Sequence, residues 1–445
     1  MRQNLLETYG RQLKVAEAYV AKNFDGKTVS NNTKLTTAVL LDNTNRWMTE
    51  SMVAGGNRAD LGDWKKFCLN LTNIAVPSLI ANDLVIVHPM TSYSGSVAYL
   101  KYEAATEKNG MKGRELNSVF GLGQMDDNRV AYTSQIIVES GDKATIDVEE
   151  KGLSYVEGNN VKYATYKFVG KDAEGNAVVA YGEEAPEGVT VEKIAYVAKQ
   201  FQMNQVPALE IPAIKPVMER IALVAEPRRI AVKYDQITAF QAKTDYGFSL
   251  DKQIAEQACG ELAYEIDTEI VDMLYEGALA HEDRLTWSKT LPVGVSKFEH
   301  YNAFLEVIEE AKAIIYKRTQ KFHPNYMVIA ADVLPILKFV NGFTAAKVAK
   351  MNGPYKVGEI DGMNVYVSPR LKGRSFFFGL NGSDMMSSAG VYAPYMAIVP
   401  TQLLGTPDGA LQQGFSTWYA KALLNKNLLV AGEITEDVHV YPYAK

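Results

Sequence analysis

The side chains best suited to bind a metal ion are the five histidines, and their spacing builds no metal site. No two of them stand at i and i+4, and no His-Glu-x-x-His string occurs, so a helical zinc site is not expected. The string His281-Glu282-Asp283 could bind a hard or borderline cation. A solvated turn after a long helix is the more ordinary interpretation of these residues, and we predict no metal.

Two strings begin to match nucleotide-binding loops and do not complete them. Asp25-Gly26-Lys27-Thr28 matches the end of a phosphate-binding loop, but Ala21 stands where the first glycine belongs and no strand precedes it. Gly121-Leu122-Gly123 is followed by Asp126 in the place of the third glycine of a dinucleotide fingerprint. Neither string predicts a nucleotide site, and no cofactor is expected.

Acid–base catalysis by paired carboxylates would require buried acids with shifted pKa values. The adjacent acids Asp126-Asp127, Glu149-Glu150 and Glu183-Glu184 all lie in polar turns, where ordinary ionised side chains are the default. No catalytic residue is therefore nominated, and the sequence predicts a protein that is not an enzyme.

The strongest positive cluster is Arg370-Leu371-Lys372-Gly373-Arg374, in a loop between two expected strands. It could meet a phosphate, although three charges on one loop are more often simply solvated. Over the whole chain, 52 acidic residues against 46 basic ones give a formal charge of −6. That balance argues against a protein that mainly grips nucleic acid or an anionic membrane.

The two cysteines, Cys68 and Cys259, lie in apolar stretches, which favours free thiols over a disulfide. Arg11, Lys14 and Glu17 interrupt the first apolar positions too early for a secretory signal. Nowhere does the chain hold the run of about 18 apolar residues that a membrane-spanning helix needs. We expect a soluble protein.

The first half of the chain alternates between helical, irregular and strand-like segments. An apolar repeat at three or four residues predicts an amphipathic helix over 1–24, and Asn, Thr and Gly predict an extended arm with short helical pieces over 25–63. A strand is expected around 97–100, followed by a polar loop over 103–135. β-Branched and aromatic runs then predict a small all-β insertion of about four to six strands at 136–198.

A long helix is the most informative element of the second half. Ser249 can cap it, and apolar residues recur at three or four positions from Leu250 to Met273. It should run about 27 residues, or roughly 40 Å, which exceeds the width of a small domain and requires a spine with different neighbours along its length. Eight acids and one base between 249 and 276 give this helix a charge of −7, so the rest of the chain is near neutral.

Strands are predicted on both sides of this spine helix. They are Ile221–Val232, Tyr234–Phe240, Tyr326–Ala330, Phe376–Phe378, and the tail runs Met396–Val399, Phe415–Ala420 and Leu428–Val430. The tail runs need a sheet formed elsewhere in the chain.

Local signals place helices and a hairpin between these strands. Ser296 and Glu299 form a capping box that should open a second helix ending near Thr319. A short helix is expected over 333–340, and Asp361-Gly362 should turn a hairpin. Residues 290–390 therefore predict a mixed α/β block.

Several strings carry a family resemblance. They are Ala75–Asp83, His88–Ser92 with Gly95, and Ala389–Tyr395, with Glu265-Ile266-Asp267 and Tyr326–Ala330 between them in the expected order. Together they resemble the major capsid proteins of tailed bacteriophages with the HK97-like fold, specifically the contractile-tailed (myovirus) branch.

The resemblance implies an α+β fold, the HK97-like capsid fold, with a long spine helix, an extended loop and a small all-β insertion. It divides the chain into an N-terminal arm (1–75), an entry to the peripheral domain (76–100), an extended loop (101–205) carrying the β-insertion (136–198), a peripheral domain (206–290) with the spine helix (249–277), an axial domain (291–390) and a return to the peripheral domain (391–445).

The implied function is that of a major capsid protein. It would self-assemble into hexamers and pentamers of an icosahedral head shell that encloses double-stranded DNA without reading its sequence. Scaffold, portal, and decoration or vertex proteins are the other implied partners, with no membrane. The implied location is the virion, after synthesis and assembly in the host cytoplasm. On the long loop, we predict that Lys112, Arg114, Glu115 and Arg129 meet a neighbouring subunit through charge pairs.

Members of this branch are often trimmed by a maturation protease that favours an aliphatic residue two positions before a Glu. Leu5-Leu6-Glu7 fits that pattern only loosely, and we expect no cleavage there.

Two other functions stay open at this point. The chain could be the pentameric vertex protein of such a phage, or an encapsulin-type shell protein. A member of another class would bind surface carbohydrate through the β-insertion, with Tyr155, Tyr163, Tyr166 and Tyr181 stacking on sugars. Cross-strand packing is the more ordinary role for these tyrosines.

Overall fold

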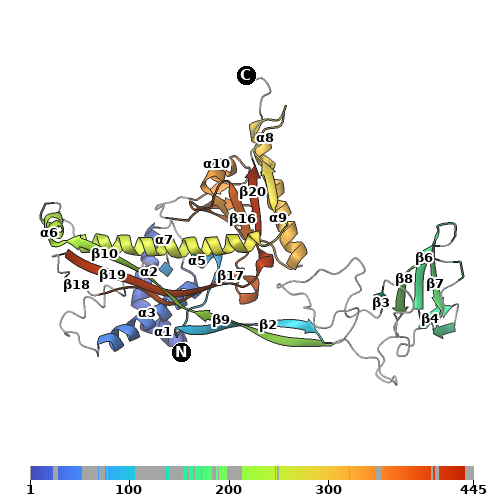
Figure 1. Ribbon diagram of the computed structural model, residues 1–445, viewed down its shortest axis with the longest axis horizontal. Coiled ribbons are helices and arrows are strands. Elements are labelled where there is room, and N and C mark those ends of the chain that lie inside the picture. The colour runs from blue at the N-terminus through green and yellow to red at the C-terminus, as the bar shows by residue number, and fades with distance from the viewer. Residues whose placement is uncertain are drawn as a thin grey trace. The chain divides into compact units, whose positions relative to one another are not determined.

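The computed structural model divides the chain into two units, one that joins Met1–Tyr99 to Arg220–Lys445 and one formed by Leu100–Glu219 (Figure 1). The described residues are 2–23, 29–52, 69, 76–77, 79–105, 136–139, 154–157, 160–163, 166–171, 173–182, 187–188, 190–197, 213–245, 247, 250–319, 321–346, 353–401, 404–405 and 410–435. The larger unit combines helices with two sheets, which confirms the predicted α+β class.

A five-stranded sheet lies under the long helix of the larger unit. Its order is β1 (Ile86–Val87), β17 (Gly390–Pro400), β19 (Ala410–Leu423) and β10 (Glu226–Asp235), with β18 (Leu404–Gly405) paired to β19. β1 runs parallel to β17 and the other pairs are antiparallel. Two of the predicted tail runs therefore complete a sheet begun much earlier in the chain.

The spine helix is α7 (Leu250–Leu279), which confirms the long helix expected from the sequence. Near its start, Leu262 packs in one apolar cluster with Phe415 of β19. Near its end, Gly277 lies against Leu423, so closely that a Cβ added to the glycine would meet that side chain at 2.8 Å. The winding apolar stripe does give successive parts of the helix different neighbours. The proposed cap, residue 249, lies outside the described residues.

A seven-stranded sheet forms the other half of the larger unit. Its order is β11 (Leu285–Ser288), β20 (Val430–Thr435), β16 (Ser375–Gly379), β12 (Tyr326–Ala330), β15 (Met363–Ser368), β14 (Tyr355–Ile360) and β13 (Thr344–Ala345). The predicted buried strand Phe376–Phe378 is part of β16, and all three rings are fully buried. Asp361 and Gly362 turn the predicted hairpin with φ of 49° and 74°, as a two-residue turn of this kind requires.

The helices of this half follow the sequence signals closely. Ser296 and Glu299 form the predicted capping box at the start of α8 (Lys297–Asn302), and α9 (Phe304–Thr319) follows after a one-residue break. α9 packs against β11 and β20, and its Phe304 ring meets Phe376 edge-on at 5.4 Å. The short helix expected over 333–340 is reduced to a 3₁₀ turn and α10 (Leu334–Leu337).

The N-terminal region differs from its prediction. The single helix expected over 1–24 is divided at Tyr9 into α1 (Arg2–Thr8) and α2 (Gly10–Asn23). The extended arm expected over 25–63 is wrong for most of its length, since α3 (Asn31–Met52) is one continuous helix.

α3 forms despite its Asn and Thr content because those side chains find partners. Ser30 Oγ accepts the backbone N–H of Thr33 at 3.1 Å, which caps the first turn. The Thr37 hydroxyl donates to the Thr33 carbonyl at 2.8 Å, and Asn43 Nδ2 donates to the Tyr395 carbonyl of β17 at 2.8 Å. Local and tertiary bonds together outweigh the weak helix propensity of these residues.

The strand expected over Tyr234–Phe240 is also wrong in part. β10 ends at Asp235, and α6 (Gln236–Asp245) begins there. The Asp235 carboxylate accepts the backbone N–H of Ile237 at 3.3 Å and so starts the helix, a local side-chain bond that the apolar composition hid.

The smaller unit holds the β-insertion, whose described strands number six. They are β3 (Ile136–Glu139), β4 (Ser154–Glu157), β5 (Asn160–Tyr163), β6 (Tyr166–Lys171), β7 (Ala177–Gly182) and β8 (Thr190–Val197). β3, β8, β6 and β7 form one antiparallel sheet, and β4 pairs with β5. The described residues between 136 and 198 therefore form strands and turns, in agreement with the predicted β composition, while the bounds of the insertion stay a prediction.

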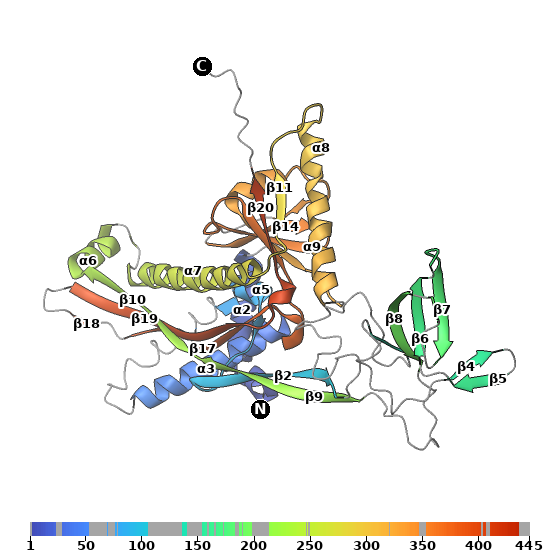
Figure 2. The ribbon, with the colours of Figure 1, turned by 45° about the vertical axis from the view of Figure 1, so that its right-hand side comes forward.

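Two further strands, β2 (Ser94–Ala104) and β9 (Ile214–Val224), pair with each other as a two-stranded sheet. Figure 2 shows them side by side. We call this pair the ribbon. The strand predicted around 97–100 is part of it, while the run Ile221–Val232 is divided between β9 and β10 at Ala225.

The domain boundaries implied by the family resemblance stay a prediction. The segment 391–445 contributes to both sheets of the larger unit. Its strands β17 and β19 pair with each other in the five-stranded sheet, between β1 and β10, and its strand β20 lies between β11 and β16 in the seven-stranded sheet.

Candidate assembly surfaces

The four residues predicted to meet a neighbouring subunit, Lys112, Arg114, Glu115 and Arg129, lie outside the described residues. Their charge pairing therefore stays a prediction. The described side chains differ in burial, in bonding and in exposure, and these three properties show which of them are available for contact.

A metal site and a membrane-spanning helix each have requirements against which the described residues can be compared. No group of three or more His, Cys, Asp or Glu side chains there could hold a metal ion. His281 and its acidic neighbours form a bend after α7, where Arg318 Nη2 bonds Asp283 at 3.2 Å. Within the same residues, no helix combines the length and apolarity needed to cross a membrane.

Cys259 is a buried free thiol on α7. Burial, with a smaller effect of Glu256, raises its pKa to about 12. A thiol held protonated in this way is a poor nucleophile and acts as an apolar packing residue. Cys68 lies outside the described residues.

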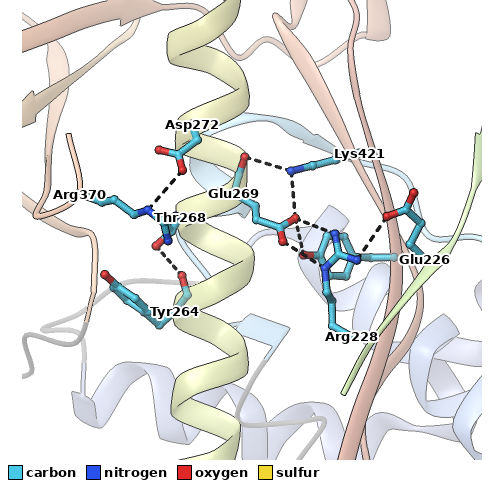
Figure 3. A network of polar contacts seen from close by, with 9 residues as sticks. Glu226, Arg228, Tyr264, Thr268, Glu269, Asp272, Arg370 and Lys421 are labelled. Carbon is cyan, nitrogen blue, oxygen red and sulfur yellow. Dashed lines mark hydrogen bonds and ion pairs between the residues drawn. The ribbon is translucent and has the colours of Figure 1, made fainter. Parts of the chain in front are cut away.

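A network of charged side chains holds the five-stranded sheet against the spine helix (Figure 3). Glu269 of α7 accepts from Arg228 Nε at 3.1 Å, from the Tyr419 hydroxyl at 2.9 Å and from Lys421 Nζ at 2.9 Å. Burial alone would raise the pKa of the Glu269 carboxyl, but the bonds from Arg228, Lys421 and Tyr419 outweigh it and lower the pKa to about 2. The carboxylate thus ties β10 and β19 to one turn of α7.

This network and one nearby ion pair neutralise part of the acidity that the sequence concentrates in α7, and a backbone N–H satisfies a further acid. Asp267 is buried and accepts the backbone N–H of Ala81 at 3.0 Å. Asp272 pairs with Arg370 Nε at 3.6 Å, so the basic loop noted in the sequence has an acidic partner within the subunit. The exposed acids among the described side chains of α7 are Glu256, Glu261, Glu265 and Glu276.

The register of the ribbon follows from two backbone bonds. Ala225 N donates to the Tyr93 carbonyl at 3.0 Å, and Ala105 N donates to the Ala213 carbonyl at 2.9 Å. Each bond joins a pair of antiparallel partners. The number of residues from Tyr93 to Ala105 equals the number from Ala213 to Ala225. Counting along the strands therefore places Leu100 opposite Met218.

One face of the ribbon is apolar and exposed. Tyr102 and Ile214 lie an even number of residues from Leu100 and Met218 and so share their face. The exposed fractions are 36% for Leu100, 49% for Tyr102, 57% for Ile214 and 60% for Met218, and Pro216 on the same face is exposed as well. Such a continuous apolar surface is typical of a contact site rather than of a free monomer surface.

This surface cannot be predicted from the sequence, because its two strands lie far apart in the chain. The available signal was the alternation along Ile214–Val224, but alternation does not tell which face is covered.

Smaller apolar exposures occur in the larger unit. Ile237 and Phe240 are 65% and 69% exposed on one side of α6. Leu291, Val293 and Phe298 are exposed in the segment that leads from β11 into α8.

Comparisons with known proteins agree with one another. A family model described as "Major capsid protein Gp23" matches residues 61–440, beginning after α3. The chain is 22% identical over 387 residues to the "Major capsid protein" of Enterobacteria phage T6, covering 79% of this chain and 76% of that protein. It is also 22% identical over 387 residues to the "Major capsid protein" of Enterobacteria phage T4, covering 79% of this chain and 73% of that protein.

Among solved structures, one from Microbacterium phage Oxtober96 is similar with a TM-score of 0.40 and 13% identity, covering 81% of this chain and 91% of that chain. A second, "The capsid of Myoviridae Phage XM1", has a TM-score of 0.37 and 11% identity, covering 79% of this chain and 90% of that one.

Proposed function

Because the chain belongs to the Gp23 major capsid protein family, we propose that copies of it assemble into hexamers and pentamers that form an icosahedral head shell around double-stranded DNA. The resemblance to tailed-phage major capsid proteins noted in the sequence is confirmed by the same match. Membership supports a structural role without catalysis, and an HK97-like form of the α+β fold.

The exposed apolar face of the ribbon is the observation that best supports self-assembly. A two-stranded ribbon is marginally stable in water unless a partner covers it. Burying a side chain such as Leu100 or Met218 contributes about 1.5–3 kcal/mol relative to leaving it exposed. A second copy of the chain is the partner that a shell supplies in quantity, and head-to-tail contacts of this kind close a shell when their rotation permits.

The remaining partners belong to the same proposal. Scaffold, portal, and decoration or vertex proteins would meet the shell, which is assembled in the host cytoplasm and becomes part of the virion. The shell would enclose DNA without reading its sequence. The formal charge of −6 and the four exposed acids among the described side chains of α7 predict a weak intrinsic affinity of the subunit for DNA. Tight binding of the isolated subunit to duplex DNA at physiological salt would contradict this part.

Particle formation tests the function directly. We expect the purified chain to give uniform closed shells in electron micrographs, alone or with a co-expressed scaffold. A protein that stays monomeric under every condition, with or without scaffold, would refute the proposal.

A matched pair of variants tests the ribbon. Met218→Glu places a carboxylate on the apolar face, and Lys215→Glu places the same side chain on the opposite face of the same strand. A carboxylate buried without a partner costs several kcal/mol, so we expect Met218→Glu to reduce assembled protein by at least about tenfold. The Lys215→Glu protein should assemble far more fully. If both variants assembled equally well, the apolar face of the ribbon would not be part of the contact between subunits.

The alternatives have separate tests. A vertex protein occupies only the five-fold positions, so the copy number per particle distinguishes it from the major shell protein. For carbohydrate binding, the side chains of Tyr155, Tyr163, Tyr166 and Tyr181 are not among those described, and that function stays a prediction. Deleting 140–195 should leave assembly largely intact if the insertion serves binding, and should abolish assembly if it braces a neighbour.

A further inference from the structure

A polar hub formed by Asn325, Asn381 and Ser388 lies where the two sheets of the larger unit meet. Asn325 directly precedes β12 and is fixed to the seven-stranded sheet, since its N–H donates to the Gly379 carbonyl at 3.0 Å. Asn325 and Asn381 bond each other twice, through Asn325 Nδ2 to the Asn381 carbonyl at 2.7 Å and through Asn381 N–H to Asn325 Oδ1 at 3.0 Å. The backbone of Asn381 therefore belongs to the seven-stranded half.

The side chain of Asn381 reaches the other half. Its Nδ2 donates to the carbonyls of Asp83 and Val85 at 2.9 and 3.3 Å, directly before β1 of the five-stranded sheet. Ser388 Oγ lies within hydrogen-bond distance of two acceptors, Asn381 Oδ1 at 3.2 Å and the Gly390 carbonyl at 3.0 Å, and itself accepts the N–H of Ile86 at 3.2 Å. The reverse orientation of the amide would aim its oxygen at two carbonyls, so the contacts determine its orientation.

The chain segment that carries the hub is itself closed. Ala389 N–H donates to the Leu380 carbonyl at 3.1 Å, and Gly382 N–H donates to the Ser387 carbonyl at 2.9 Å. A Cβ added to Gly382 would lie 2.1 Å from Ser387 Oγ, so this approach requires glycine. Because this segment is closed, it cannot lengthen to absorb a change of angle between the two sheets. The Asn381 amide opposes such a change together with α7, which packs against β19 of one sheet and β20 of the other.

We infer that Asn381 is a positioning residue that sets the angle between the two sheets and, through that angle, the curvature of the assembled shell. This inference rests on the proposed function. Each sheet has its own exposed surface beside it. Exposed residues of α6 lie beside β10 of the five-stranded sheet, and the exposed Leu291–Phe298 segment follows β11 of the seven-stranded sheet. A subunit that contacts neighbours through both halves passes a change in its internal angle to every contact, and repetition turns that change into a different curvature.

The test compares Asn381→Ala with the matched control Asn302→Ala. The Asn302 side chain likewise bonds the backbone, although as an acceptor: its Oδ1 accepts the N–H of Asn341 at 2.8 Å, and both residues belong to the seven-stranded half. We expect Asn381→Ala to fold and to assemble into shells of mixed diameter or into open sheets. The fraction of particles at the wild-type diameter should fall by about tenfold, since loss of one to two hydrogen bonds to buried carbonyls shifts a balance by about that factor. Asn302→Ala should match wild type in diameter.

A second variant serves if Asn381→Ala does not fold. Ser388→Ala keeps the Asn381 bonds to Asp83 and Val85 and removes the hydroxyl that accepts from Ile86 and contacts Asn381 Oδ1 and the Gly390 carbonyl. It should broaden the diameters less than Asn381→Ala. If wild type forms shells and both folded hub variants give its diameter distribution, the inference is overturned while the proposed function stands. Failure of wild type to form any shell would instead refute the proposed function.

Discussion

β9 of the ribbon and β10 are consecutive in the chain and both alternate between more and less exposed residues, yet their apolar residues are covered differently. The inward residues of β10, Ile230 and Val232, pack against the α7 cluster. The ribbon residues Leu100 and Met218 remain exposed. The difference shows that alternation specifies a face to be covered without specifying what covers it: a helix of the same chain in one case and, under the proposed function, a second copy in the other.

The largest effect should come from removing a side chain that the subunit itself buries completely. Phe377→Ala removes a fully buried ring from β16, and buried Phe→Ala changes cost about 3–5 kcal/mol. Tyr102→Ala, on the ribbon, should change the unfolding free energy of the isolated subunit by no more than about 0.5 kcal/mol. Urea denaturation of both variants measures the difference, and similar losses in the two would mean that the ribbon is covered within its own subunit.

The polar network of α7 gives the next largest effect. Glu269→Gln keeps the shape of the side chain but removes the charge that faces Arg228 and Lys421. We expect the unfolding free energy to fall by about 1–2 kcal/mol, at the lower end for charged hydrogen bonds because the three side chains are partly exposed. Glu261→Gln, on an exposed part of the same helix, is the control and should be nearly neutral.

The same carboxyl predicts a pH dependence. Its pKa is lowered to about 2 in the folded protein from an ordinary value of 4.5. Its contribution is therefore fully present above pH 4.5 and is lost as the pH falls from there toward about 2. The difference in unfolding free energy between wild type and Glu269→Gln should shrink over that range, and a difference that stays constant would show that the carboxylate is not the stabilising group.

The smallest effect is expected on the ribbon side of a pair of isoleucines that lie on consecutive strands. Ile230→Ala, against α7, should cost about 1–2 kcal/mol because Ile230 is only partly buried. Ile214→Ala, on the ribbon, should cost less than about 0.5 kcal/mol in the isolated subunit and should still lower the yield of shells. Thermal unfolding and particle counts together check this. An Ile214→Ala protein with wild-type assembly would exclude that residue from the contact.

Elements marked by local chemistry could be predicted. The capping box of Ser296 and Glu299, the Asp361-Gly362 turn and the buried run Phe376–Phe378 depend on neighbours within a few residues, and the structure confirms each. α3 was missed because its buried polar residues, such as Asn43, are satisfied by Tyr395, a residue distant in the chain.

The sequence by itself determined the α+β class, the spine helix, the β-insertion and, through family strings, the class of protein, because periodicity and turn chemistry act over short distances. Only the tertiary structure decided which acids of α7 are neutralised, which ribbon face is uncovered and how Asn381 joins the two sheets. Those outcomes depend on residues such as Arg228 and Glu269, or Leu100 and Met218, that meet only when the chain has folded. Long-range pairing leaves no spacing in the sequence from which it could be deduced.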